Sequence, residues 1–575
     1  MAEFDTLIKG GMVVDGTRTP RYRADVAIKD GVIAEIGHIE AHRAQKVLDA
    51  AGLIVAPGFV DLHTHYDAQV FWDPYCSISS WHGITTVVIG NCGFGFAPVA
   101  PEARERAMLS MTRVEAIPLA SMKAGMPWDW VTFPEYLDSV ERTPKAMNIV
   151  PYVPISPILI SVLGLEDAKA GRLPTAAEHA EMRRIFEQSL DAGGCGWSAQ
   201  RLPPSGPGGV QLDYDGTAMP TDVMHNETAL EFAKVLGERN MGHMQMTMVS
   251  GDPRADRAHM EELAQVSGRP LVFNAVQAQD TQPHIHRKVI EWLERCRENG
   301  IRVYGQGLTT DAGYAFTFED WNLFDECPAW REATVGTREE RLAKLADPAR
   351  RPALRAQLPK FVLGPFENIV VTGPVAEASR QWLDHTVGLI AEKTGKHVVD
   401  AMLDIVVEDG LETEFFSMPP NTRLDLLKEI VDNPYILFGV SDGGAHTKFL
   451  TAGRYPTETL TKIVREHGML SLEDAHWRLS ALPASLAGCT DRGTLAVGAP
   501  ADVVVYDYDK LDILPPEIVH DLPGGEWRRV QRATGYRYIL VNGEVTIEND
   551  AQTQVYSGAL LRHGSGRVTL RRAAA

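Results

Sequence analysis

The sequence has no excess of basic residues. Among its 575 residues, Lys and Arg together number 56 and Asp and Glu number 76, which gives a formal net charge of −20. A chain this acidic has no general electrostatic attraction for nucleic acid or for an anionic membrane. We therefore expect neither of them as a partner.

Cysteine is also scarce, and long apolar runs are missing. The chain has 6 cysteines and no Cys-x-x-Cys pair, which predicts no disulfide framework. The acidic N-terminus lacks the apolar core of a signal peptide, so we expect a cytoplasmic protein. The best membrane candidate, residues 148–165, is short and is broken by prolines at 151, 154 and 157. Internal repeats and low-complexity segments are absent as well.

Both ends of the chain have the pattern of β structure. In residues 1–56, two strand-like segments flank Asp30-Gly31, a dipeptide typical of two-residue hairpin turns. Residues 493–575 have the same character, with a second such turn at Asn542-Gly543. Strands from opposite ends of a chain can pair, and we expect these to form one small β-sandwich.

Between these ends, residues 57–492 alternate short apolar strands with helical stretches, which is the pattern of a parallel α/β barrel. Helical periodicity predicts helices over Ala176–Ala192, Thr228–Arg239 and His286–Asn299. We therefore predict an α/β fold, a TIM-like (β/α)8 barrel with a composite β-sandwich. The eight candidate strands are Val55–Tyr66, Ile84–Cys92, Asn148–Pro157, Cys195–Gln200, Gly242–Met248, Pro270–Val276, Arg302–Gly307 and Tyr435–Gly444.

A long segment, residues 309–433, separates the seventh and eighth predicted strands. It contains a charged helical run, Arg338 to Leu358, and an apolar stretch, Phe361 to Val371. An insertion of this length at the catalytic end of a barrel usually serves as a lid or a substrate wall.

The stretch from Pro57 to His65 carries the strongest chemical signal. Side chains alternate along a strand, so His63 and His65 face the same side, together with Asp61. Two imidazoles at that pitch can converge on one divalent cation. We interpret this strand end as a metal site.

Two further candidates end predicted strands, where the catalytic groups of a barrel lie. Asp442 ends the eighth strand, so it can bind the metal, accept a proton from water, or both; the alternative is a turn-forming Asp before glycines. Cys92 ends the second strand. Its thiolate would be a good zinc ligand, and the alternative is a buried thiol that packs as a small apolar side chain.

Three neighbours complete the candidate site. Asn91 and Gly93 flank Cys92, and we assign both to substrate binding, because the glycines of this loop can bring backbone amide donors close to an oxyanion. His446 follows Asp442 by four residues. It is a candidate proton shuttle or substrate contact, although a loop histidine could have neither role.

Several motifs stand in a characteristic order: Ala56 to His65, Gly90-Asn91-Cys92-Gly93-Phe94-Gly95, Ser441-Asp442-Gly443, Gly493 to Val505, and Val541-Asn542-Gly543. Together they resemble the amidohydrolase superfamily and, within it, the N-acyl-D-amino-acid deacylase (D-aminoacylase) branch. The resemblance spans nearly the whole chain. It implies a metal-dependent hydrolase of amide-like bonds, built as a barrel with a composite β-sandwich.

The resemblance also implies roles for the matching residues. His63, His65 and Asp442 would serve one metal position, and Asp442 would also transfer the proton. Cys92 would be the metal-ligand cysteine of the family. In related enzymes an arginine binds the carboxylate of the substrate, and Arg454, twelve residues after Asp442, is our candidate for it. A guanidinium offers a carboxylate two parallel donors, although a surface arginine at a helix start would look the same.

The sequence departs from this family at two positions. Family members have histidines near the ends of the fifth and sixth strands, where this chain has Met246 and Asn274. His243 lies too early in its strand to replace them. Cys92 then lacks partners for a second metal, so we expect one Zn²⁺ ion, with a second ion as the alternative. Three other histidines lie in helices or loops and are interpreted as solvated: His225, His284 and His286.

The resulting hypothesis is a zinc-dependent hydrolase of an amide-like C–N bond in an N-acyl or N-carbamoyl amino acid, or a similar small carboxylate. Two alternatives stay open: a hydrolase of cyclic amides, lactones or esters on the same barrel, and a catalytically silent barrel that binds a ligand. A neutral cyclic substrate would give Arg454 no carboxylate to bind. The sequence leaves the acyl group, the stereochemistry and the oligomeric state open, a homo-oligomer included.

Overall fold

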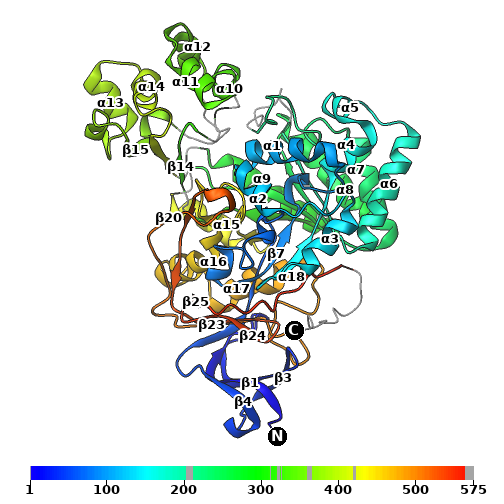
Figure 1. The fold of residues 1–575 in the computed structure, drawn as a ribbon. Coiled ribbons are helices and arrows are strands. Elements are labelled where there is room, and N and C mark those ends of the chain that lie inside the picture. The colour runs from blue at the N-terminus through cyan, green and yellow to red at the C-terminus, as the bar shows by residue number, and fades with distance from the viewer. Residues whose placement is uncertain are drawn as a thin grey trace.

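A computed structural model of the chain describes residues 2–202, 211–280, 282–310, 313–319, 324, 327–358, 365–418 and 422–563. Three parts are visible in Figure 1: a β-sheet built from both ends of the chain, a central barrel, and a lobe formed by the long insertion.

The predicted strands form a parallel barrel in the predicted order, except that the first is divided: its beginning lies in β5 (Ile54–Pro57) of the terminal sheet, and only β6 belongs to the barrel. One sheet contains β6, β7 and β8, and a second runs β9, β10, β11, β12, β13 and β17. The third predicted strand is split at Tyr152 into β8 and β9, and an isolated parallel bridge between Thr64 and Gly443 joins the first strand to the last. The bounds are β6 (Phe59–Asp61), β7 (Ile84–Ile89), β8 (Asn148–Pro151), β9 (Val153–Pro154), β10 (Gly196–Arg201), β11 (His243–Met248), β12 (Leu271–Val276), β13 (Val303–Gly307) and β17 (Ile436–Phe438).

Helices cover the outside of the barrel where their periodicity predicts them. The three predicted helices are present as α6, α7 and α9. The start of α6 is defined by a capping box, in which Thr175 and Glu178 satisfy each other's backbone amides. The helices between the strands and next to the last strand are α6 (Ala176–Asp191), α7 (Asn226–Arg239), α8 (Pro253–Ser267), α9 (His284–Glu298) and α15 (Leu424–Asp432).

The two ends of the chain share a nine-stranded sheet, which confirms that they pair. Strand β5 runs antiparallel to β18 and joins the N-terminal strands to the C-terminal ones. Both predicted hairpin turns have positive φ at their two central residues, 51° and 79° at Asp30-Gly31 and 49° and 86° at Asn542-Gly543, as a type I′ turn requires. The strands are β1 (Phe4–Val13), β2 (Tyr22–Lys29), β3 (Val32–Gly37), β4 (Ala44–Asp49), β5 (Ile54–Pro57), β18 (Val503–Tyr506), β23 (Tyr536–Val541), β24 (Glu544–Glu548) and β25 (Ala551–Gln552).

The insertion forms a lobe with its own apolar core, which stands beside the mouth of the barrel (Figure 1). The charged run from Arg338 is not one helix but two, because the chain turns at Pro348 between α11 and α12. Of the apolar stretch, residues 361–364 lie outside the described residues. The elements of the lobe are β14 (Tyr314–Phe316), α10 (Pro328–Thr334), α11 (Arg338–Ala346), α12 (Arg351–Ala356), β15 (Val370–Gly373), α13 (Val387–Thr394), α14 (Val398–Glu408) and β16 (Glu414–Ser417).

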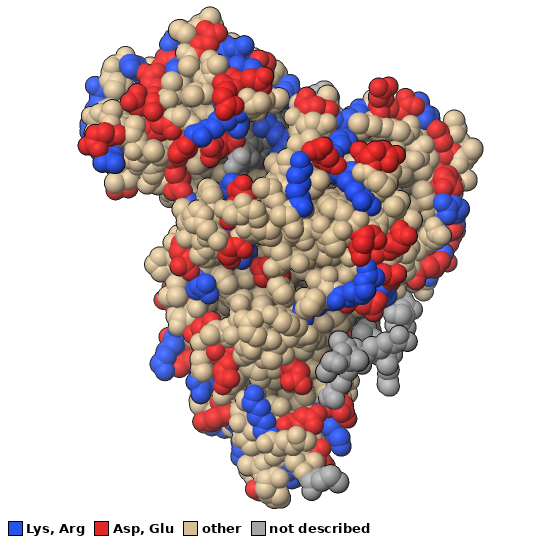
Figure 2. Space-filling view, in the orientation of Figure 1, with Lys and Arg blue, Asp and Glu red and all other residues tan. Residues whose placement is uncertain are grey.

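Charged side chains of both signs are interspersed on the face of the molecule drawn in Figure 2. Among the described residues, no helix combines the length and the apolar character needed to cross a membrane.

Candidate metal centre

The two histidines after β6 converge with the aspartate after β17. His63 and His65 are each 2% exposed. Their Nε2 atoms lie 3.1 Å and 3.7 Å from Oδ1 of Asp442. The backbone amide of His65 donates to the carbonyl of Gly443 at 2.6 Å, so the closure of the barrel itself brings these strand ends together. The structure therefore places the predicted pair and Asp442 in one group.

Cys92 belongs to the same group, and we call His63, His65, Cys92 and Asp442 together the metal group. Its Sγ lies 3.7 Å from Nε2 of His63, and the potential ligand atoms of His63, His65 and Cys92 all lie within 4.8 Å of one another. Burial, together with the nearby carboxylates of Glu115 and Asp442, raises the pKa of the Cys92 thiol well above its usual value. A thiolate at this position therefore needs a bound cation, and two imidazoles with a thiolate are a donor set that suits zinc.

The residues that flank Cys92 support the loop. The Asn91 amide donates to the carbonyls of Thr64 and Val88 at 3.1 Å and 2.9 Å, which ties the cysteine loop to the histidine strand. Gly93 has φ 79°, and a Cβ there would lie 2.8 Å from the carbonyl oxygen of Ser198. Both residues lie beside the metal group, and their assignment to substrate binding stays a prediction.

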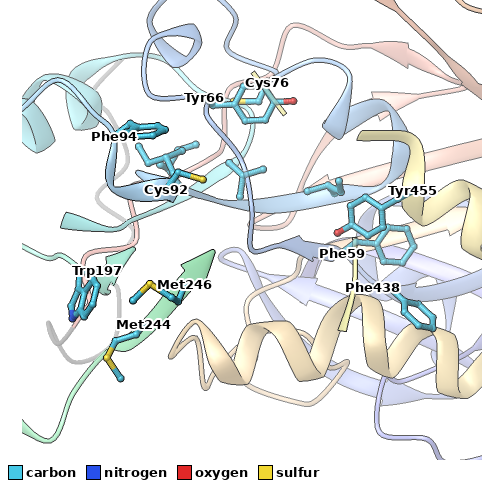
Figure 3. Packing of buried hydrophobic residues seen from close by; sticks show 14 of the residues in the cluster. Phe59, Tyr66, Cys76, Cys92, Phe94, Trp197, Met244, Met246, Phe438 and Tyr455 are labelled. Atoms are coloured by element: carbon cyan, nitrogen blue, oxygen red, sulfur yellow. The ribbon is translucent and has the colours of Figure 1, made fainter. Parts of the chain in front are cut away.

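Asn274 contacts the metal group directly, as its place in the sequence predicted. Its Nδ2 lies 2.6 Å from Nδ1 of His63, and its Oδ1 is buried without a hydrogen bond. If the side-chain amide of Asn274 is flipped, its Oδ1 would accept a hydrogen bond from Nδ1–H of His63. Nε2 of His63 would then be free to bind a cation. Met246 is fully buried in the apolar cluster that also contains Cys92 (Figure 3).

The remaining histidines lie away from the centre. His243 begins β11, and its Nε2 lies 2.5 Å from the hydroxyl of Tyr152, so it is no substitute ligand. His225 and His284 are exposed, as expected. The expectation of a solvated His286 was wrong: the side chain is buried, and Glu429, 2.9 Å from its Nε2, compensates for the lost water. Within the described residues, His63, His65 and Cys92 form the one cluster of three potential ligands.

Glu115, which sequence reasoning missed, completes the group. It follows α1 (Arg104–Val114) and is 2% exposed. Its Oε1 lies 3.6 Å from Nδ1 of His65 and its Oε2 lies 3.5 Å from Nε2 of His446. Burial, with the charge of Asp442, raises the pKa of Glu115 well above its usual value. No motif surrounds this glutamate, so nothing in the sequence could have singled it out.

The contacts with Glu115 place His446 in the candidate site. Its backbone amide donates to the carbonyl of Glu115 at 2.7 Å, and its ring is buried. Burial lowers its pKa, while the charge of Asp442 opposes that shift. The proton-shuttle role stays a prediction.

Asp442 is the member of the group that faces the opening, since 27% of its side chain is exposed. Loss of solvent disfavours its charged form, but the hydrogen bond with His63 and the nearby imidazoles outweigh this and hold its pKa well below the usual range. Burial raises the pKa of Tyr314 in β14 to about 12, and the charge of Asp442 adds to that shift. The first strand of the insertion is therefore within electrostatic reach of the metal group.

Arg454 lies in a separate cavity. Its guanidinium donates to Glu458 at 3.0 Å, to Gln531 at 2.9 Å and to Thr451 at 3.0 Å. The cavity, of about 480 Å³, opens between the insertion lobe and the barrel and is also lined by Glu414 of the lobe. The structure does not bring Arg454 into contact with the metal group.

Comparison with known proteins agrees with this architecture. N-acyl-D-glutamate deacylase of Alcaligenes xylosoxydans xylosoxydans is 28% identical over 94% of this chain and 93% of its own, and D-aminoacylase of the same organism is 26% identical over 97% of both. The crystal structure of N-acyl-D-glutamate deacylase from Bordetella bronchiseptica, complexed with zinc and a phosphonate inhibitor, is 24% identical with a TM-score of 0.66, covering 97% of this chain and 100% of that one. Residues 46–192 and 376–547 match the amidohydrolase family. This chain therefore belongs to the amidohydrolase family.

Proposed function

We propose that the protein is a zinc-dependent hydrolase that releases the acyl group from an N-acyl amino acid. The observation that carries the proposal is the convergence of His63, His65 and Cys92 beside Asp442 at the mouth of the barrel. Its similarity to two deacylases over nearly its whole length supports the substrate class.

The chain's own donors fit a zinc ion. Two imidazole nitrogens and a thiolate would hold it, with Asp442 as an oxygen donor beside them. When bound, the ion would polarise the substrate carbonyl and lower the pKa of a water molecule. The side chains behind the ligands would keep them oriented: Asn274 contacts His63, and Glu115 lies beside His65.

Asp442 is the proposed proton carrier. Its low pKa keeps it ionised at neutral pH, and its exposure lets it reach the substrate. It would accept a proton from the attacking water and return it to the leaving nitrogen, which departs as an amine. His446 would assist at the same mouth, and the backbone amides near Gly93 would bind the developing oxyanion.

Arg454 stays our candidate carboxylate anchor on the family resemblance alone, because its guanidinium lies in a cavity apart from the metal group and is paired with Glu458. Arg454→Lys keeps the charge but loses the two-donor fork. We expect kcat/KM on the best acidic substrate to fall by roughly 10–100-fold, the scale of about 1–3 kcal/mol for a charge-assisted hydrogen bond. An unchanged kcat/KM would show that the anchor lies elsewhere.

The function is tested by a hydrolysis screen of the zinc-loaded protein. The panel pairs N-acyl D- and L-amino acids with lactams, lactones and simple esters. We expect turnover of N-acyl amino acids and its loss in His63→Ala, with the exposed His225→Ala as the matched control. Turnover of the lactams or lactones alone would replace this proposal with a cyclic-substrate hydrolase. No turnover of any compound by a metal-loaded protein would favour a silent barrel.

A further inference from the structure

A second cavity, of about 320 Å³, lies behind the cysteine loop, between α1 and α4 (Ile155–Leu163). Its volume is within the range of small-molecule sites. Its wall is mostly apolar, with side chains that include Phe94, Val99, Met111, Pro157, Ile160 and Met219. Nothing in the mechanism above uses this cavity.

Three segments lead from the metal centre to this cavity. The cysteine loop continues from Cys92 to Phe94, which lies beside it in Figure 3 and lines the cavity. Helix α1 carries Met111 on the cavity wall, one turn before Glu115. Met219 also lines the cavity, and Cγ2 of Thr221, two residues later, lies 3.1 Å from a Cβ built at Gly93. Lining residues of the cavity are therefore only two residues along the chain from Cys92 and one helical turn from Glu115.

The charged group on the cavity wall is already neutralised. The Arg106 guanidinium forms an ion pair with Asp213, which is fully buried. Asp213 also accepts from Ser110 at 2.5 Å and pairs with Lys169 at 2.7 Å. Because Asp213 already balances the charge of Arg106, the mostly apolar wall favours an uncharged, apolar occupant.

We propose that this cavity binds the alkyl chain of the substrate's acyl group, which makes medium-chain N-acyl amino acids the preferred substrates. The inference rests on the proposed deacylase function and specifies its substrate. The carbonyl would lie at the metal centre and the chain would extend past Phe94 along α1. Each methylene transferred from water into an apolar site contributes about 0.8 kcal/mol, or roughly a fourfold gain in kcat/KM.

The first test is a chain-length series on one amino acid: N-acetyl, N-butanoyl and N-octanoyl. Four methylenes separate butanoyl from octanoyl, so we expect kcat/KM to rise by roughly 200-fold between them. Ala107 and Ala103 line the cavity, and Ala107→Phe or Ala103→Leu would fill part of it. Either variant should lower the octanoyl-to-acetyl ratio by at least about tenfold. Ala177→Phe, at an exposed position of α6, is the matched control and should leave the ratio unchanged.

Equal kcat/KM for acetyl and octanoyl substrates would overturn the cavity proposal and leave the deacylase function intact. An unchanged ratio in both filled variants would overturn it as well. If no N-acyl amino acid is hydrolysed, the deacylase function fails, and calorimetry with the uncharged octanamide then tests the cavity by itself. Binding that is lost in Ala107→Phe and kept in Ala177→Phe would support the alkyl site. No binding of octanamide to the unaltered protein would refute it.

Discussion

Asp442→Asn separates the proton-transfer role of Asp442 from metal retention. The substitution keeps the side-chain shape and one oxygen but removes the base. Three potential ligands, His63, His65 and Cys92, are untouched. We therefore expect the variant to keep most of its zinc. Turnover should fall by the roughly 10²–10⁴-fold typical of a lost general base, which corresponds to a rise of about 3–5 kcal/mol in the activation free energy.

The pH dependence of the activity follows from the direction of the pKa shift of Asp442. The pKa of Asp442 lies below the usual range for an aspartate, so the carboxylate is charged at any pH above that usual range. Protonation of Asp442 should therefore cause no loss of wild-type activity between about pH 5 and 8. Activity of the Asn variant should stay low across that whole interval, because an amide cannot accept the proton at any pH.

The assay pairs zinc content, measured by elemental analysis of dialysed protein, with kcat on the best substrate from the screen. Asp432→Asn, which removes the same charge from the exposed end of α15, is the matched control. If zinc and activity disappear together, Asp442 is mainly a ligand, and His446 becomes the first candidate for the base. If activity stays within a few-fold of wild type, the assignment of Asp442 is refuted.

Three further predictions use other parts of the molecule. Elemental analysis should find about one tightly bound zinc per chain and its loss in Cys92→Ser, whereas two fully occupied ions would contradict the single-site interpretation. Glu115→Gln should weaken zinc binding by roughly 10–100-fold, as loss of a residue behind a ligand does, and unchanged affinity in a chelator competition would count against that role. Burial lowers the pKa of His82 to about 4, so its contribution to stability is complete above pH 6.5 and declines as the pH falls towards 4, by about 3 kcal/mol. Urea unfolding at pH 7.5 and 5 should register about 2 kcal/mol of this decline, and His82→Asn should reduce it.

The sequence by itself determined the barrel and the pairing of the two ends of the chain with each other. Short apolar strands separated by helical periodicity are local signals, and all of the predicted strand positions carry a strand or a split strand. The two hairpin turns were equally local, because Asp30-Gly31 and Asn542-Gly543 tolerate the positive φ that the turn needs. The charged run from Arg338 is the exception, since Pro348 divides it into two helices.

Four residues of the candidate metal site were predicted in the same way. His63 and His65 follow from the two-residue period of a strand, and Cys92 and Asp442 follow from the rule that strand ends meet at one mouth. Asn274 was identified as an altered ligand position, and its contact with His63 became visible only in three dimensions.

The tertiary structure alone decided what surrounds those ligands. Glu115 directly follows helix α1, and its carboxylate meets His65 and His446 only because the fold brings the end of that helix to the metal group. Arg454 follows Asp442 closely in sequence, yet its side chain lies in another cavity, bound to Glu458. Strand ends obey a repeating geometry that a sequence displays, whereas the direction of a loop and the packing of a helix depend on distant side chains, which no local pattern specifies.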